Sequence, residues 1–191
     1  MLRAANIFLF TFIVKALSIK MIELDDYIRL IPDFPKPGVI FKDITTLLAD
    51  KEASAFCLET LLELVGDEPI DKVVGIESRG FFFGMLLAQR LNAGFVPVRK
   101  PGKLPAATLK EPYQLEYGMD VLEIHEDAIS KGDRILIHDD VLATGGTARA
   151  ACNLVEKLGG KIVQCNFIME LMFLDGRQKL RNYNIGSALQ Y

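Results

Sequence analysis

Two adjacent carboxylates followed by a glycine-rich turn are the residues of this sequence best suited to chemistry. Asp139 and Asp140 follow a run of branched aliphatic residues, and a turn of small residues from Ala143 to Thr147 comes shortly after. A glycine-rich turn that enters a helix exposes backbone N–H groups at the positive end of the helix dipole, which suits an anion. Two carboxylates beside that turn would repel free phosphate unless they bind a cation or sugar hydroxyls. The stretch therefore favours a phosphorylated sugar.

The same turn could be an ordinary strand-to-helix connection whose glycines only reverse the chain. It is not a Walker loop, because no Gly-Lys-Ser/Thr follows it, and it lacks the G-x-G-x-x-G spacing of dinucleotide-binding turns. Gly145 and Gly146 would let the backbone come close to a phosphate, and Thr144 and Thr147 would add hydroxyl donors. The combination of strand, Asp pair and flanking threonines favours a binding site.

Cationic side chains follow two other predicted strands. Arg79, in the segment Glu77 to Gly80, could pair with a phosphate through its planar guanidinium, or could be a surface residue of a turn. Arg99, Lys100 and Lys103 could attract a multiply charged substrate, or could form a solvated surface.

Alternating strands and helices position these groups. Buried-strand patterns cover residues 72–76, 95–99, 135–137 and 161–169, with a short terminal strand at 187–190. Helical patterns cover 51–65, capped by Asp50, then 81–91 and the segment after Thr147, and a short helix is expected near residues 175–180. This order predicts an α/β single domain with a mostly parallel central sheet flanked by helices, whose ligands bind at the carboxyl ends of the strands.

Three further segments are predicted from local patterns. Residues 21–31 read as a short amphipathic helix. Residues 100–112 contain three prolines and little periodicity, which predicts a loop that acts as a lid. Residues 115–118 and 120–125 read as two strands of a hairpin.

The composition excludes several classes of protein. A net charge of −3 over 191 residues gives no sign of a nucleic-acid surface. Three scattered cysteines and two histidines form no metal-binding spacing, and buried free thiols suggest a reducing cytoplasm. Residues 1–20 carry an apolar run too short to span a membrane. We expect an extension outside the functional domain of residues 21–191, with a signal peptide as the alternative.

Five segments together resemble the type I phosphoribosyltransferases. Arg134 to Thr147 resembles the family's ribose-5-phosphate motif, and Glu77 to Phe81 resembles its pyrophosphate loop. Arg99 to Pro105 resembles the opening of its catalytic loop, and Leu115 to Gly118 resembles a Leu-Glu-Tyr-Gly segment beside the reacting ring. Phe34 to Ile44 resembles the base-covering hood of the members that act on adenine.

The resemblance implies a role for each matching residue. Catalysis falls to Glu116, Asp139 and Asp140. The 5-phosphate and ribose would be bound by the same two aspartates and by Ala143, Thr144, Gly145, Gly146 and Thr147. Pyrophosphate would be bound by Ser78, Arg79, Arg99, Lys100 and Lys103, and adenine by Ile40, Phe41, Lys42 and Tyr117.

The implied reaction transfers a 5-phosphoribosyl group from phosphoribosyl pyrophosphate to adenine. The resemblance further implies a small N-terminal hood, a flexible catalytic loop, Mg²⁺ held mainly by the substrate with no direct protein ligand, and a homodimer without nucleic-acid or membrane partners. A transferase for another base, such as hypoxanthine, xanthine or orotate, and a non-catalytic sensor of phosphoribosyl pyrophosphate remain as alternatives.

Two residues depart from the family pattern. Many relatives have arginine at the position of Lys42, and an aliphatic residue more often precedes the Asp pair where this chain has His138. We expect His138 to be packed or partly exposed and not catalytic, with a pKa that the adjacent acids raise.

Overall fold

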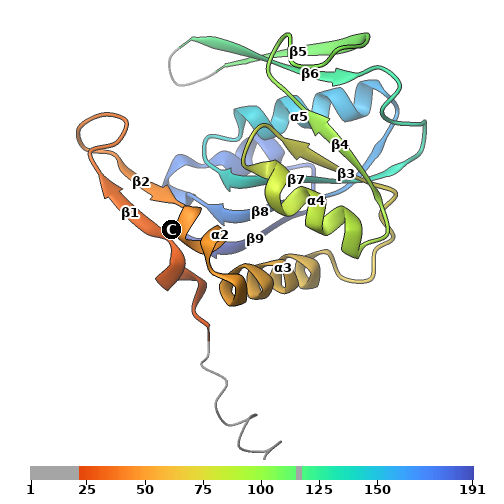
Figure 1. The fold of residues 1–191 in the computed structure, drawn as a ribbon. Coiled ribbons are helices and arrows are strands. Elements are labelled where there is room, and N and C mark those ends of the chain that lie inside the picture. The colour runs from red at the N-terminus through yellow and green to blue at the C-terminus, as the bar shows by residue number, and fades with distance from the viewer. Residues whose placement is uncertain (1–21, 115–117) are drawn as a thin grey trace, which may run out of the picture.

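A five-stranded parallel sheet forms the centre of the protein (Figure 1). The structure is a computed structural model that describes residues 22–114 and 118–191. The strand order is β4 (Gly94–Val98), β3 (Lys72–Ile76), β7 (Arg134–Leu142), β8 (Lys161–Glu170) and β9 (Ile185–Gln190). All four neighbouring pairs are parallel, which confirms the predicted α/β architecture.

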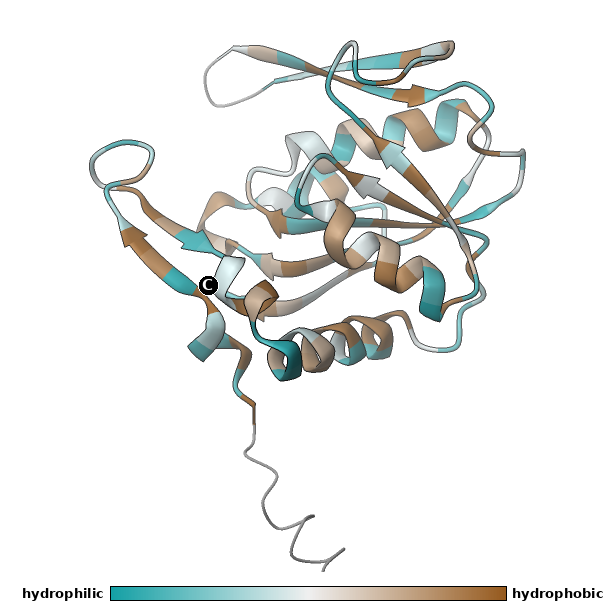
Figure 2. Cartoon of the chain, viewed as in Figure 1, coloured by the Kyte–Doolittle hydropathy of each residue, from teal (hydrophilic) through white to brown (hydrophobic). Residues whose placement is uncertain are grey.

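Helices cover both faces of the sheet and divide the core into two clusters. Helices α3 (Lys51–Val65) and α4 (Gly80–Arg90) pack on one face, and α5 (Gly146–Lys157) packs on the other. Alternate residues of β7 serve the two clusters: Ile135 and Ile137 face α5, whereas Leu136 faces the cluster of α3 and α4. Figure 2 shows the apolar residues concentrated along these packed elements.

The predicted helix over residues 21–31 is wrong. The structure has one 3₁₀ turn, η1 (Leu24–Tyr27), followed by strand β1 (Arg29–Pro32), which pairs antiparallel with β2 (Ile40–Asp43). Leu24 and Ile28 are buried as a helix would bury them, but the ladder with β2 supplies hydrogen bonds that a helix would otherwise make. The two strands form the small N-terminal hood, and α2 (Thr45–Ala49) connects it to α3.

The predicted loop over residues 100–112 is wrong at its C-terminal end. Strand β5 (Thr108–Gln114) pairs antiparallel with β6 (Met119–His125), so the hairpin begins earlier than residue 115. Its inward residues Leu109 and Tyr113 pack with the α5 cluster, and Pro112 with the charged residues Lys110 and Glu111 hides this alternation in the sequence. Residues 115–117 lie outside the described part of the chain.

The C-terminal part differs slightly from its prediction. The helix expected near residues 175–180 is a 3₁₀ turn, η3 (Gly176–Leu180), preceded by another, η2 (Met172–Leu174). Among the residues described, no helix combines the length and the apolar character that a bilayer crossing requires.

Candidate active site

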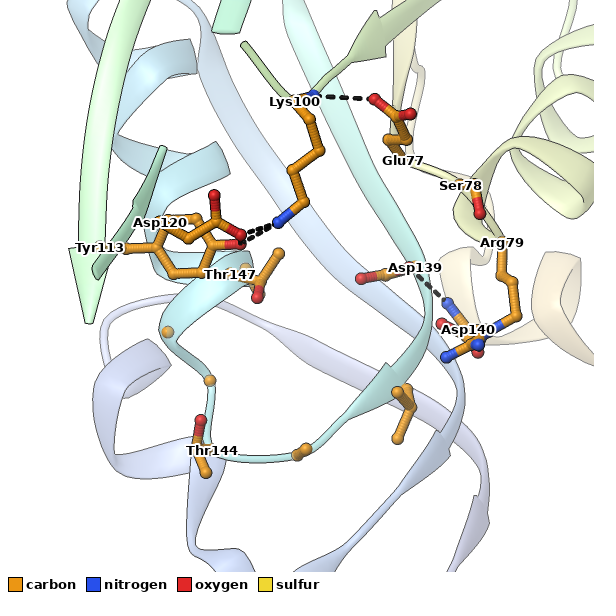
Figure 3. A pocket seen from close by; sticks show the side chains of 15 residues that line it. Glu77, Ser78, Arg79, Lys100, Tyr113, Asp120, Asp139, Asp140, Thr144 and Thr147 are labelled. Atoms are coloured by element: carbon orange, nitrogen blue, oxygen red, sulfur yellow. Dashed lines mark hydrogen bonds and ion pairs between the residues drawn. The ribbon is translucent and has the colours of Figure 1, made fainter. Parts of the chain in front are cut away.

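A cavity of about 360 Å³ opens at the carboxyl ends of β3 and β7 (Figure 3). The hairpin of β5 and β6 and the N-terminus of α5 complete its walls. This is the edge of a parallel sheet at which α/β proteins bind ligands. The cavity is lined by Glu77, Ser78, Arg79, Lys100, Tyr113, Asp120, Asp139, Asp140, Val141, Ala143, Thr144, Gly145, Gly146, Thr147 and Ala148.

Asp139 and Asp140 point to opposite sides of β7, as successive residues of a strand must (Figure 3). The Asp139 carboxylate faces the side of the cavity that holds Thr147, and its Oδ1 accepts the backbone N–H of Asp140 at 2.9 Å. The Asp140 carboxylate is buried and forms an ion pair with Arg79. The two acids therefore have different electrostatic partners although they are neighbours.

The Asp139 carboxyl has a raised pKa. Burial is the main cause, and the negative charge of Asp140 adds to it, while Arg79 partly opposes both. A buried carboxylate without a cation of its own is stabilised by hydroxyl donors. Asp139 is thus suited to accept hydrogen bonds from the hydroxyls of a sugar.

The cationic residues predicted to bind pyrophosphate occupy different positions. Arg79 and Lys100 line the cavity together with Ser78. Arg99 lies behind them, where its guanidinium donates to both Glu77 oxygens at 3.2 Å. Lys103 is exposed and does not line the cavity.

Glu77 organises this wall of the cavity. Its Oε2 also accepts the backbone N–H of Lys100 at 2.8 Å. Burial tends to raise the pKa of the Glu77 carboxyl, but the bonds from Lys100 and Arg99 outweigh it and lower the pKa. Glu77 is therefore ionised at neutral pH and fixes the start of the segment that carries the lysines.

Tyr113 and Asp120 are site residues that the sequence alone did not identify. The Lys100 ammonium donates to the Tyr113 hydroxyl at 2.9 Å and forms an ion pair with Asp120 (Figure 3). Burial lowers the pKa of Lys100, but these two partners outweigh that effect and the pKa is raised. Only the alternating pattern of residues 109–113 could have indicated that Tyr113 points inward.

The glycine-rich turn from Ala143 to Thr147, here called the phosphate loop, leads from β7 into α5 as its sequence predicts. Gly145 is left-handed with φ 74° and caps α5, so the first N–H groups of this helix face the cavity. The loop rests on Gly176 of η3, because a β-carbon on Gly176 would lie far inside contact distance of the Ala143 carbonyl oxygen. Loop and η3 therefore have a close backbone fit.

A second cavity, of about 350 Å³, lies beneath the hood. Ile40, Phe41 and Lys42 line it, together with largely apolar residues of the loops and of β8. The two cavities share the walls formed by Arg79, Val141 and Ala143. The Arg79 guanidinium lies 5.5 Å from the centre of the Phe41 ring, so one side chain contacts both the hood and the Asp pair.

Three predicted site residues remain, namely Lys42, Glu116 and Tyr117. Lys42 places its ammonium 3.2 Å from the centre of the Tyr191 ring, and its pKa is lowered by burial, an effect that Asp25 partly opposes. Glu116 and Tyr117 lie outside the described residues, and their roles stay predictions.

The prediction of a raised His138 pKa is wrong. Burial lowers the pKa of His138 to about 4, and this outweighs the bond with Asn166 and the charge of Asp140. The Asn166 amide nitrogen donates to Leu61 and Gln164, so its oxygen is left to accept from His138 Nδ1 at 3.1 Å. His138 is consequently neutral, with the proton on Nδ1.

This buried histidine should make the protein acid-sensitive. Its folded-state pKa of about 4 lies below the ordinary value of 6.5, so the unfolded chain takes up a proton first as the pH falls. Stability is then lost progressively from about pH 6.5 down to about pH 4. We expect wild type to lose about 2 kcal/mol more unfolding free energy between pH 7 and pH 5 than His138→Gln, measured by urea titration. Parallel losses in the two proteins would contradict this assignment.

The geometry suits a phosphorylated sugar beside a largely apolar pocket, and the comparisons agree with it. Residues 43–182 match the phosphoribosyl transferase domain family, and the chain belongs to that family.

Its relatives include enzymes named for adenine. The chain is 63% identical over 169 residues to the adenine phosphoribosyltransferase of Flavobacterium johnsoniae, covering 88% of this chain and 99% of that protein. The crystal structure of adenine phosphoribosyltransferase from Rhodothermus marinus is similar with a TM-score of 0.84 and 56% identity, covering 88% and 96%. The Saccharomyces cerevisiae enzyme, crystallised with an imino-altritol bisphosphate and adenine, gives 0.80 and 43%, covering 85% and 94%.

Proposed function

We propose that this protein transfers the 5-phosphoribosyl group of phosphoribosyl pyrophosphate to N9 of adenine, giving AMP and pyrophosphate in purine salvage. The observation that carries the proposal is the shared wall between the two cavities. The first has carboxylates and a phosphate loop for the sugar phosphate, and the second is apolar beneath Phe41 for a flat base. The names of relatives at 50–63% identity support adenine as the base.

In this mechanism the substrate is positioned before any bond changes. The phosphate loop holds the 5-phosphate, and Asp139 and Asp140 accept hydrogen bonds from the ribose hydroxyls. C1 of the sugar would then lie near Arg79 and Val141, which line both cavities. The N9 electron pair forms the new bond to C1 as the bond from C1 to the pyrophosphate oxygen breaks.

Charge develops on the sugar ring during this exchange. The departing pyrophosphate leaves an oxocarbenium-like ring, and the carboxylates on β7 favour its positive charge. The N9 proton leaves adenine for a base. Glu116, to which the family resemblance gives a catalytic role, would support this proton removal or stabilise the cation on the ring.

The site also suits the magnesium ion that phosphoribosyltransferases generally use with this substrate. Mg²⁺ keeps several waters and binds through one or two carboxylates plus substrate phosphates. Within residues 22–114 and 118–191 no cluster of three or more potential ligands exists, whereas the carboxylate of Asp139 lines the cavity. The ion would neutralise charge on the pyrophosphate, and Asp139 or Asp140 could hold it through water.

Pyrophosphate would lie on the cationic side of the first cavity. Arg79, Lys100 and Ser78 line that side, and Lys100 would exchange Asp120 for a phosphate oxygen. Arg99 and Lys103 would act after a rearrangement of the segment that follows β4. Closure of this segment over the substrate would exclude water and prevent hydrolysis of the activated sugar.

A base-competition assay tests the proposal directly. Purified protein, Mg²⁺ and phosphoribosyl pyrophosphate are incubated with adenine, hypoxanthine, guanine, xanthine and orotate, and the nucleotides are separated. AMP should dominate, and its formation should stop when the metal is chelated. Another nucleotide would keep the sugar site and overturn the base assignment. Binding of phosphoribosyl pyrophosphate without product would identify a sensor.

The hood makes a separate prediction. Phe41→Ala should raise the KM for adenine by roughly tenfold, because base–aromatic stacking contributes about 1–3 kcal/mol, while the KM for phosphoribosyl pyrophosphate changes little. Steady-state kinetics with each substrate varied would measure this. Phe56→Ala is the matched control, since Phe56 is an exposed phenylalanine of α3 that lines neither cavity. Equal effects of the two changes would contradict the stacking role.

The assembly and compartment are part of the same proposal. Phe82, Met85 and Leu86 are exposed together on α4, at spacings that place them on one face of the helix. We assign this face to a second copy of the chain, and light scattering of wild type and Phe82→Ser would test the dimer. Cys57, Cys152 and Cys165 are buried free thiols, which supports a reducing compartment such as the cytoplasm.

A further inference from the structure

The phosphate loop has no cation of its own. Phosphate-binding turns of the Walker type place a lysine inside the loop sequence, and this loop contains only alanine, glycine and threonine. The first cavity does contain Arg79 and Lys100, but both are already paired, Arg79 with Asp140 and Lys100 with Asp120 and the Tyr113 hydroxyl. Within the cavity, the end that receives the 5-phosphate therefore depends on backbone N–H groups and threonine hydroxyls.

A lysine from a distant segment lies next to this loop. The Lys179 ammonium is 3.8 Å from the position that a β-carbon on Gly146 would take. Gly146 and Tyr113 line the first cavity, and both also line a smaller one of about 230 Å³ that includes Lys179. The ammonium thus stands at the first residue of α5, behind the loop and on the same helix end.

The backbone that carries Lys179 is held firmly against the loop. Gly176 fits against the backbone of Ala143 and Gly145 so closely that no β-carbon could be accommodated. Leu180 is fully buried, and Arg177 pairs with the buried Glu170 at 2.7 Å. Segment η3 is therefore anchored on both sides of Lys179, whose own side chain is exposed.

Among the described residues, Lys179 has no competing partner. In the part of the chain that the structure describes, no hydrogen bond or ion pair involves its ammonium, whereas the neighbouring Arg149 donates to the Tyr183 hydroxyl at 2.7 Å. An ammonium is a compact charge on a flexible stem, which can turn toward an anion without breaking an existing bond.

We propose that Lys179 is a binding residue for the 5-phosphate of phosphoribosyl pyrophosphate, and that it supplies from η3 the positive charge that the phosphate loop lacks. The inference rests on the proposed function for the identity of the sugar. Its charge acts on a phosphate that does not react, so it should stabilise the bound substrate and the transition state equally. It should therefore affect KM and leave kcat unchanged.

Calorimetric titration with two separate probes tests this role. Lys179→Gln should weaken the binding of ribose 5-phosphate about tenfold and leave the binding of magnesium pyrophosphate within twofold. Lys179→Arg should restore most of the ribose 5-phosphate affinity. The KM for phosphoribosyl pyrophosphate should rise by the same factor in Lys179→Gln, with kcat unchanged. Lys131→Gln, which removes an exposed lysine near the other end of α5, should change none of these values.

The outcomes distinguish a failure of the proposed role of Lys179 from a failure of the proposed function. Unchanged ribose 5-phosphate affinity in Lys179→Gln would overturn the role of Lys179, with the proposed function intact. Equally weakened binding of ribose 5-phosphate and magnesium pyrophosphate would also overturn this role, because it would indicate a nonspecific electrostatic effect on the binding of anions. If the wild-type protein binds neither probe, the result would contradict the proposed function and also the role of Lys179 that depends on it.

Discussion

Asp139→Asn should lower kcat by about 10²–10³-fold, as expected when a preorganised group that stabilises transition-state charge is removed. The same change should raise the melting temperature at pH 7–8. The folded-state pKa of Asp139 is raised, so its ionised form costs stability at pH values above that pKa, and asparagine removes the cost. The difference in stability should vanish below about pH 4, where the carboxyl is protonated in both states. Rapid-quench kinetics and thermal melts over pH measure the two effects.

Asp140→Asn is the matched change at the adjacent residue. It should also lower kcat by orders of magnitude, but it should lower stability instead of raising it. Arg79 loses its buried partner, and because the Arg79 side chain is 42% exposed, solvent screening limits the loss to about 1–2 kcal/mol. The opposite signs of the stability effects would confirm that the two acids have different partners. Near-normal turnover in both variants would show that neither carries the assigned chemistry.

Gly176→Ala should have the second large effect, although Gly176 lines neither cavity. The new methyl group would collide with the Ala143 carbonyl, so the phosphate loop and η3 must separate. Overpacking of this kind costs about 1–3 kcal/mol of stability. A displacement of about 1 Å at the phosphate loop should lower kcat/KM for phosphoribosyl pyrophosphate by roughly 100-fold. Steady-state kinetics and urea unfolding measure both.

Gly94→Ala controls for the loss of a glycine as such. A β-carbon on Gly94 would find its nearest neighbour, Lys72 Cγ, at 3.5 Å, which is ordinary van der Waals contact. Activity should be unchanged and stability equal or slightly higher. If Gly176→Ala left activity and stability unchanged, as Gly94→Ala should, the close fit between η3 and the phosphate loop would not be needed for function.

The sequence by itself determined the alternating architecture and the position of the sugar-phosphate site. Runs of aliphatic residues such as Ile135 to Ile137 can only be buried, and Gly145 permits the left-handed turn that starts α5. These are local properties, because burial periodicity and turn geometry depend on residues close in the chain. The same locality explains the failures at residues 21–31 and 100–112, where pairing with a distant strand decided the conformation.

Only the tertiary structure decided the electrostatic environment of each group. The sequence places His138 beside two acids, which predicts a raised pKa, whereas the packed core removes water and lowers it to about 4. Asp120 and Tyr113 come to the site, and Lys179 to the back of the phosphate loop, from segments whose own patterns give no functional signal. Desolvation and charge pairing depend on which segments meet in space, and a linear pattern of residues does not contain that information.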